Sequence, residues 1–242
     1  MQDLGYTRSV LQATHLVHSP DTFVRARLPG MHLANAIVHA SPDLGAKFLQ
    51  YTAELEPNGH LGNTSQQRFV WVQSGAVTVT ASARTHTLEA RGYAYLPEGT
   101  PHSVAAQSAS CIEVIEKPYE SLSGVSAPLP LASHEDEVAS VSLMNDEALQ
   151  VRSLLPDAES FDFAVNTMQY QPGAALGMVE VHAMEHGLLM LEGGGIYRLA
   201  NAWYPVKAGD FIWMAPYCPQ WFGAIGKVPA KYLIYKNWNR SY

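Results

Sequence analysis

The chain repeats its own pattern of turns and short apolar segments after a shift of 118 residues. Under this shift Gly75 falls on Gly193, and Pro101 falls on Pro219. Identity between the halves is low, but both follow the order strand, glycine turn, strand, Gly/Pro turn, strand. A repeat of this length corresponds to a whole domain rather than to one unit of a solenoid. Two strand-rich halves could also match by pattern alone, but the shared order favours a duplicated domain.

Most segments between the Gly and Pro turns are about 5–8 residues long and rich in aromatic and β-branched residues, which is typical of strands. This spacing predicts an all-β barrel or sandwich. One segment, Asp146–Leu155, has weak helical character, and Ser121–Glu137, rich in serine, proline and acidic residues, is interpreted as a linker. The expected strands are Phe48–Leu55, Phe69–Gln73, Ala76–Ala81, Tyr93–Leu96, Cys111–Ile115, Phe163–Tyr170, Gly187–Leu191, Ile196–Leu199, Asp210–Met214 and Lys231–Lys236.

Composition excludes several classes of protein. A formal net charge of −7 argues against a nucleic-acid-binding surface. The sequence contains no run of 18 apolar residues that would cross a membrane, and its first residues do not form a signal peptide. The two cysteines, Cys111 and Cys218, make neither a disulfide framework nor a CxxC site. We therefore expect a cytoplasmic protein with no nucleic-acid or membrane partner.

One short segment carries three side chains that can bind a metal ion: Glu180, His182 and His186. On an extended strand, side chains two residues apart share a face, so Glu180 and His182 would converge, and His186 would keep that parity if the strand continued or turned once. One carboxylate and two imidazoles make a mixed oxygen and nitrogen site for a divalent cation of the Mn, Fe, Co, Ni or Zn group.

The alternative is a helix with a solvated face, because His182 and His186 are also four residues apart. The helical zinc signature is His-Glu-x-x-His. Here Ala183 follows the first histidine, so the signature does not match, and the surrounding segments favour strands.

The pattern of the C-terminal half resembles the cupin superfamily. Its first motif has three ligands followed by a glycine, matched here by Glu180, His182 and His186 and by Gly193. Its second motif has a glycine, a proline and a ligand, which are matched by Gly209, Pro216 and Gln220. Glu and Gln replace two of the usual histidines, and this substitution resembles the (S)-ureidoglycine aminohydrolase family of bicupins. The resemblance covers roughly residues 5–240 and is strongest over 165–240.

This resemblance implies two tandem cupin domains, each a jelly-roll-like β-barrel. We place the N-terminal domain at 1–125, a linker at 126–145 and the C-terminal domain at 146–242. It also implies Mn²⁺ as cofactor, whereas the ligand types alone leave Fe, Ni and Zn open. The implied reaction is the hydrolytic release of ammonia from (S)-ureidoglycine to give (S)-ureidoglycolate, in purine and allantoin catabolism. Such an enzyme is a hydrolase of non-peptide, amidine-type C–N bonds.

The resemblance assigns roles to five residues of this chain. Glu180 and Gln220 would bind both metal and substrate, and Glu180 would also accept a proton from water. Lys236 would pair with the substrate carboxylate, and Tyr232, four residues earlier on the same strand face, would act beside it. Tyr197 would line the pocket. The alternatives are a solvated charge at the barrel end for Lys236, core positions for the two tyrosines and a surface amide for Gln220.

The N-terminal copy differs at the equivalent positions. Under the 118-residue shift, Gly62, Thr64 and Arg68 replace the three metal ligands, and only His102 keeps a ligand type. One imidazole does not hold a divalent ion tightly, so we expect a metal-free domain that serves packing and assembly in a homo-oligomer. A weaker alternative is that nearby residues supply ligands; these are His60, Gln66 and Gln67.

Two other functions remain open at this point. The chain could be another metal-dependent cupin enzyme, such as a dioxygenase or a sugar or keto-acid isomerase, because fold analogy alone does not decide the reaction. It could also be a non-enzymatic binding, storage or sensor cupin. The Glu and Gln ligands argue against the first, and the lack of a helix-turn-helix, basic patch or signal peptide argues against the second.

Overall fold

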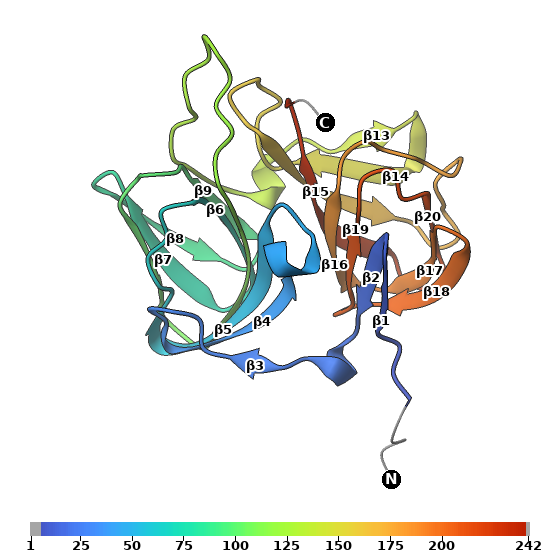
Figure 1. Ribbon diagram of the computed structural model, residues 1–242, viewed down its shortest axis with the longest axis horizontal. Helices are drawn as coiled ribbons and strands as arrows, with labels where there is room; N and C mark the ends of the chain where they lie inside the picture. The colour runs from blue at the N-terminus through green and yellow to red at the C-terminus, as the bar shows by residue number, and fades with distance from the viewer. Residues whose placement is uncertain (1–5, 241–242) are drawn as a thin grey trace. The chain divides into compact units, whose positions relative to one another are not determined.

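The computed structural model describes residues 6–240, which form antiparallel strands and three short 3-10 turns (Figure 1). The chain divides into two compact units. The unit that we call the C-terminal unit holds residues 6–23, 139–156 and 163–240, and the N-terminal unit holds residues 24–138 and 157–162. The predicted all-β class is confirmed.

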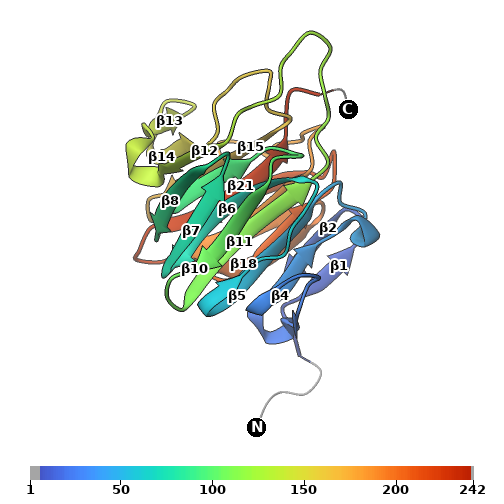
Figure 2. The same ribbon diagram turned by 90° about the vertical axis from the view of Figure 1, so that its left-hand side faces the viewer.

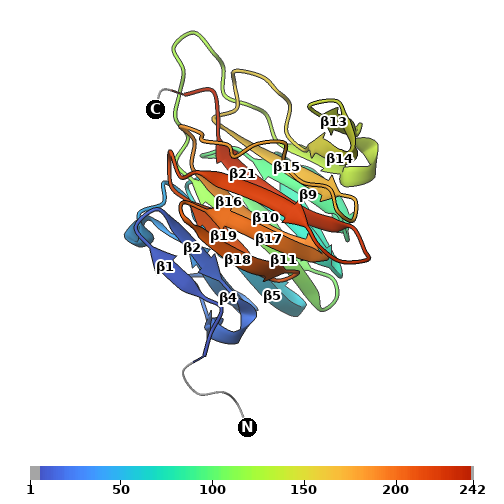
Figure 3. The ribbon, with the colours of Figure 1, turned by 90° about the vertical axis from the view of Figure 1, so that its right-hand side faces the viewer.

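The C-terminal unit contains an eight-stranded sheet, in the order β1-β2-β19-β16-β21-β15-β14-β13, and a three-stranded sheet, β18-β17-β20 (Figure 3). The bounds are β1 Val10–Gln12, β2 His15–His18, β13 Val141–Leu143, β14 Asp146–Ser153, β15 Phe163–Tyr170, β16 His186–Glu192, β17 Gly194–Leu199, β18 Ala202–Lys207, β19 Phe211–Met214, β20 Gln220–Ala224 and β21 Ala230–Asn237, with the 3-10 turn η1 at Pro20–Thr22.

The core of this unit lies on one face of each strand, because successive side chains point to opposite faces. Tyr232 and Ile234 of β21 share the buried core with Leu188 and Met190 of β16. Burying such a face is the main force that holds a sheet of this kind together. His186 lies two residues before Leu188 on β16, and Lys236 lies two residues after Ile234 on β21. Strand parity therefore places both side chains on the same face as the core residues.

The N-terminal unit is built on a ten-stranded sheet, ordered β12-β9-β6-β11-β5-β10-β7-β8, with β4 paired to β5 and β3 to β4 (Figure 2). The bounds are β3 Arg25–Ala26, β4 His32–Ala40, β5 Leu49–His60, β6 Gln67–Ser74, β7 Ala76–Ala81, β8 Arg84–Glu89, β9 Gly92–Leu96, β10 His102–Ala106, β11 Ser110–Lys117 and β12 Leu131–His134, with η2 at Pro42–Leu44 and η3 at Glu135–Glu137.

The expected repeat is visible in the strand bounds. Strands β7, β8 and β10 correspond to β17, β18 and β20 after the same 118-residue shift. The repeated glycines occupy equivalent turns, since Gly75 has φ 81° and Gly193 has φ 62°. A Cβ on either residue would lie 2.4 Å from a carbonyl oxygen, so both positions require glycine.

Three sequence expectations differ from the structure. The prediction of weak helical character for Asp146–Leu155 is wrong, because Asp146–Ser153 is strand β14. Its pairing with β15 overrides the local helix propensity. The expected linker at 126–145 contains β12, which pairs with β9, and the 3-10 turn η3. Finally, β1 and β2 join the sheet of the C-terminal unit through β19, which departs from the expected domain 1–125 (Figure 1).

The attachment of the N-terminal hairpin has a clear physical basis. Strand β2 supplies β19 with backbone partners at a sheet edge, and Val17 enters the core of the C-terminal unit. The Arg8 guanidinium donates to both carboxylate oxygens of Asp210, at 2.5 and 2.6 Å, and Asp210 is fully buried. Within residues 6–240, no helix is long and apolar enough to cross a membrane.

Candidate functional site

The three-ligand segment is a loop rather than the expected extended strand. The loop bends at Ala183 and Met184, and only His186 lies in a strand, at the start of β16. Backbone hydrogen bonds hold the loop on one side: Glu180 N donates to Gln220 O at 2.8 Å, and Gln220 N donates to Glu180 O at 2.9 Å. The bends therefore set the direction of Glu180 and His182, whereas His186 follows the parity of β16.

The two histidines and Glu180 lie beside one another. His182 Nε2 is 3.1 Å from Glu180 Oε2, and the rings of His182 and His186 are 5.3 Å apart in an edge-to-face arrangement. His186 is buried, and neither of its ring nitrogens has a hydrogen-bond partner. Burial, followed by the neighbouring His182 and Lys236, lowers the pKa of His186 to about 3. His186 is therefore neutral at physiological pH, and a ring lone pair is available.

Gln220 begins strand β20 and is buried beside a group of tyrosines. Tyr197 Oη donates to Gln220 Oε1 at 3.1 Å, and the hydroxyls of Tyr170 and Tyr232 are 2.7 Å apart. Burial raises the pKa of all three tyrosines, and the charge of Glu180 raises it further. These hydroxyls therefore stay protonated and act as hydrogen-bond donors.

Lys236 lies directly opposite His186 in the register of β21 and β16. Its ammonium is 4.2 Å from the centre of the Trp238 ring, a cation–π contact. Its positive charge contributes to the low pKa of His186. The half-buried Lys236 thus lies next to His186, one of the proposed ligands.

The sequence analysis did not identify three residues that contribute to this region, namely Tyr170, Trp213 and Asn237. Tyr170 contacts Tyr232 only because β15 pairs with β21. Trp213 Nε1 donates to Glu185 Oε2 at 3.3 Å, and Glu185 N donates to Asn237 Oδ1 at 2.8 Å, which holds the end of the loop. No local sequence pattern marks these contacts, because each joins segments far apart in the chain.

The donor set fits a divalent cation. It offers one carboxylate, two imidazoles and one amide oxygen, which suits metals of the Mn to Zn group. The unpaired, buried ring nitrogens of His186 are costly unless something satisfies them, and a bound cation would do so. As the side chains stand, the described residues 6–240 contain no group of three His, Cys, Asp or Glu arranged around one point.

A buried ion pair occupies the equivalent place in the N-terminal unit. Arg68 replaces His186, and it lies opposite Glu116 in the register of β6 and β11, as His186 lies opposite Lys236. The Arg68 guanidinium is 2.8 Å from Glu116 Oε1, and it donates to Gly62 O at 2.9 Å. A fixed cation therefore stands where the other unit has a candidate ligand.

The sheets of the C-terminal unit and the donors on their inner face define a cupin, and the Cupin domain family model matches residues 166–235. The chain is 39% identical to (S)-ureidoglycine aminohydrolase of Arabidopsis thaliana, covering 100% of this chain and 82% of that protein. It is 31% identical to the (S)-ureidoglycine aminohydrolase of Escherichia coli K12, covering 99% and 95%. The chain belongs to the (S)-ureidoglycine aminohydrolase family.

Solved structures agree with this assignment at the level of the fold. The protein Ylba from E. coli superposes with a TM-score of 0.87 at 30% identity, covering 99% of this chain and 98% of that one. Oxalate decarboxylase from Bacillus subtilis superposes with a TM-score of 0.70 at 13% identity, covering 95% of this chain and 78% of that one. At that identity the second match concerns the fold alone.

Proposed function

We propose that this protein hydrolyses (S)-ureidoglycine to (S)-ureidoglycolate and ammonia in purine and allantoin catabolism. The full-length identity to curated relatives with this activity carries the proposal. The side chains of the C-terminal unit support it, because a carboxylate, two histidines, an amide and a lysine lie in one region.

Glu180, His182, His186 and Gln220 would hold the metal, which we propose to be Mn²⁺. The bound cation would supply a Lewis acid for the amine nitrogen and a carboxylate oxygen on the reacting carbon of the substrate. Carboxylate and amide oxygens are hard donors and suit this metal. The two imidazoles complete the set as neutral ligands, which His186 is by virtue of its low pKa.

The remaining roles follow from the charges and hydrogen-bonding capacities of the side chains. The Lys236 ammonium would pair with the substrate carboxylate and so fix its orientation. The protonated Tyr232 hydroxyl would donate a hydrogen bond to the substrate, and Tyr197, whose proton is directed at Gln220 Oε1, would line the pocket. The Glu180 carboxylate would accept a proton from the attacking water and return one to the departing amine, so that ammonia leaves and a hydroxyl replaces it.

The N-terminal unit is proposed to be a metal-free cupin, because Arg68 already places a positive charge at the equivalent position. We also propose a homo-oligomer, which sedimentation of the purified protein would test. The cytoplasm remains the expected compartment, supported by two cysteines that form no disulfide.

The decisive experiment measures the product formed by metal-stripped protein with and without Mn²⁺. (S)-Ureidoglycine is generated in situ from allantoate, and the enantiomer of ureidoglycolate is determined, because the substrate also decays spontaneously. We expect Mn²⁺-dependent formation of the (S) product. Background rate and racemic product from folded, metal-loaded protein would instead favour another metal-dependent cupin reaction.

A further inference from the structure

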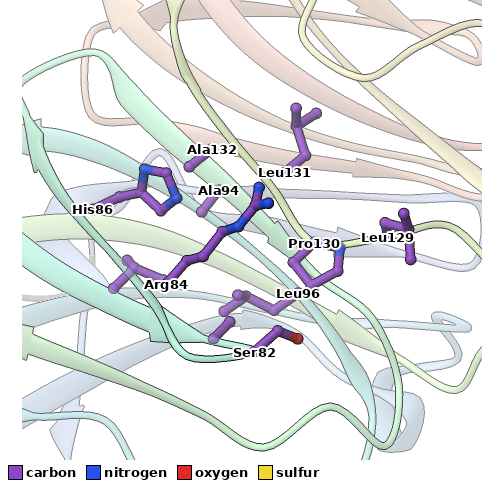
Figure 4. Close-up of a pocket in the computed structure, with 11 residues that line it drawn as sticks. Ser82, Arg84, His86, Ala94, Leu96, Leu129, Pro130, Leu131 and Ala132 are labelled. Atoms are coloured by element: carbon purple, nitrogen blue, oxygen red, sulfur yellow. The ribbon is translucent and has the colours of Figure 1, made fainter.

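A hollow of about 460 Å³ lies in the N-terminal unit, and neither Arg68 nor Glu116 is among its lining residues (Figure 4). This volume is within the range of sites for small ligands. It lies among β7, β8, β9 and the segment 129–132 that enters β12. Its lining residues are Val79, Ala81, Ser82, Arg84, His86, Ala94, Leu96, Leu129, Pro130, Leu131 and Ala132.

The hollow exists because this end of the unit has small side chains where the C-terminal unit has large ones. Under the 118-residue shift the strand positions correspond one to one. The equivalent pairs are Val79 and Tyr197, Ala81 and Leu199, and Ala94 and Ile212. In the C-terminal unit these larger side chains are buried in the core. Truncating a packed position leaves space unless the surroundings collapse, and here the space remains open.

The N-terminal unit also lacks a side-chain hydrogen bond that joins two strands at the equivalent place in the C-terminal unit. In that unit, His15 Nε2 lies 2.8 Å from the Tyr204 hydroxyl, and the contact joins β2 to β18. The equivalent residues are Pro130 and His86, as the pairing of β12 with β9 matches that of β2 with β19. A proline has no side-chain hydrogen-bonding group, so no such bond closes the hollow.

Strand parity places an exposed cation among the residues that line this hollow. Arg84 and His86 share a face of β8 with Leu88, which belongs to the buried core. Figure 4 shows the Arg84 side chain reaching into the ring of lining residues. Within residues 6–240, the guanidinium of Arg84 has no ion-pair or hydrogen-bond partner. The floor of the hollow is apolar and includes Val79 and Leu96.

From this arrangement we propose that the hollow binds a small carboxylate with a short aliphatic tail. The carboxylate accepts two hydrogen bonds from the planar Arg84 guanidinium, which matches its geometry. The His86 ring lies at the same end, and the tail packs on the apolar floor. The candidate metal centre of the C-terminal unit takes no part, so this binding does not depend on the proposed reaction.

The test uses the full-length protein and 4,4,4-trifluorobutyrate, followed by ¹⁹F line broadening. We expect saturable binding to the wild type. Arg84→Met should weaken it at least tenfold, and the uncharged analogue 4,4,4-trifluorobutanol should bind at least tenfold more weakly than the acid. Ala81→Leu, which installs the side chain of the equivalent position, should abolish binding by filling the hollow while circular dichroism stays unchanged.

Arg27→Met is the matched control, because Arg27 is an exposed arginine of the same unit outside the hollow. It should bind the probe as the wild type does. Equal affinity in the wild type and Arg84→Met, or no saturable broadening at millimolar probe, would overturn the proposal. Equal binding of the alcohol and the acid would overturn the carboxylate class.

Discussion

Gln220 is the residue that best distinguishes a proposed metal ligand from an amide with no role in metal binding. Its backbone pairs with Glu180, whereas its side-chain oxygen faces Tyr197. Gln220→Ala leaves the backbone pair intact but removes one proposed ligand. We expect metal content and turnover to fall together, by at least tenfold, in metal analysis and product assays.

Gln107→Ala is a suitable control, because Gln107 is an exposed glutamine that bonds Thr78 in the N-terminal unit. It should keep both metal and activity. If Gln220→Ala kept wild-type turnover with bound metal, its assignment as a ligand would be wrong.

Lys236 gives a second prediction at the residue scale. Lys236→Met removes the ammonium but keeps the length of the side chain, so substrate binding should weaken through loss of the carboxylate partner. We expect KM to rise at least tenfold with metal content unchanged, whereas Lys227→Met, at an exposed lysine of the same unit, should have no effect. Loss of metal in Lys236→Met would instead give this lysine a structural role.

At the scale of elements, the pairing of β6 with β11 supports a buried charge pair. Arg68→Met would leave the Glu116 carboxylate buried without its cation. Breaking such a pair costs about 3–5 kcal/mol, more than an exposed pair contributes. Urea unfolding should show a loss of this size.

The double variant Arg68→Met/Glu116→Gln removes both charges and keeps an acceptor for the Tyr51 hydroxyl, which donates to Glu116 at 2.8 Å. It should recover most of the lost stability. A double variant no more stable than Arg68→Met would show that the charge pair is not the source of the loss.

At the scale of the whole molecule, one buried acid should shape the pH dependence of stability. Glu113 accepts hydrogen bonds from Gln50 at 2.7 Å and from Thr52 at 2.8 Å, and burial raises its pKa from 4.5 to about 7. Between pH 4.5 and about 7, Glu113 therefore keeps its proton in the folded protein, whereas in the unfolded chain it has released it. Its contribution is fully present below pH 4.5 and is lost as pH rises through 7.

We expect the free energy of unfolding to fall by up to about 3 kcal/mol from this group between pH 5 and pH 8. Glu113→Gln cannot ionise, so its stability relative to the wild type should increase over that range. Parallel pH profiles of the two proteins in urea unfolding would contradict the assignment of this proton to Glu113.

Much of the fold follows from local signals in the sequence. Glycine turns and aromatic, β-branched segments identified the strands, and Gly75 and Gly193 marked the repeat. The N-terminal hairpin was not predictable in the same way, because β2 pairs with β19 almost 200 residues away. Strand β12 was hidden in a serine- and proline-rich stretch, since its partner β9, and not its own composition, makes it a strand.

The candidate site shows the same division. Residue types and spacing predicted Glu180, His182 and His186 as ligands, because ligand chemistry depends on which side chains are present, and the resemblance to the second cupin motif added Gln220. Tertiary structure alone decided that bends rather than strand parity direct the loop, and that sheet register sets Lys236 opposite His186. The sequence determines the available chemistry and the local turns. Long-range pairing decides which groups meet, because cross-strand contacts depend on partners that no local pattern encodes.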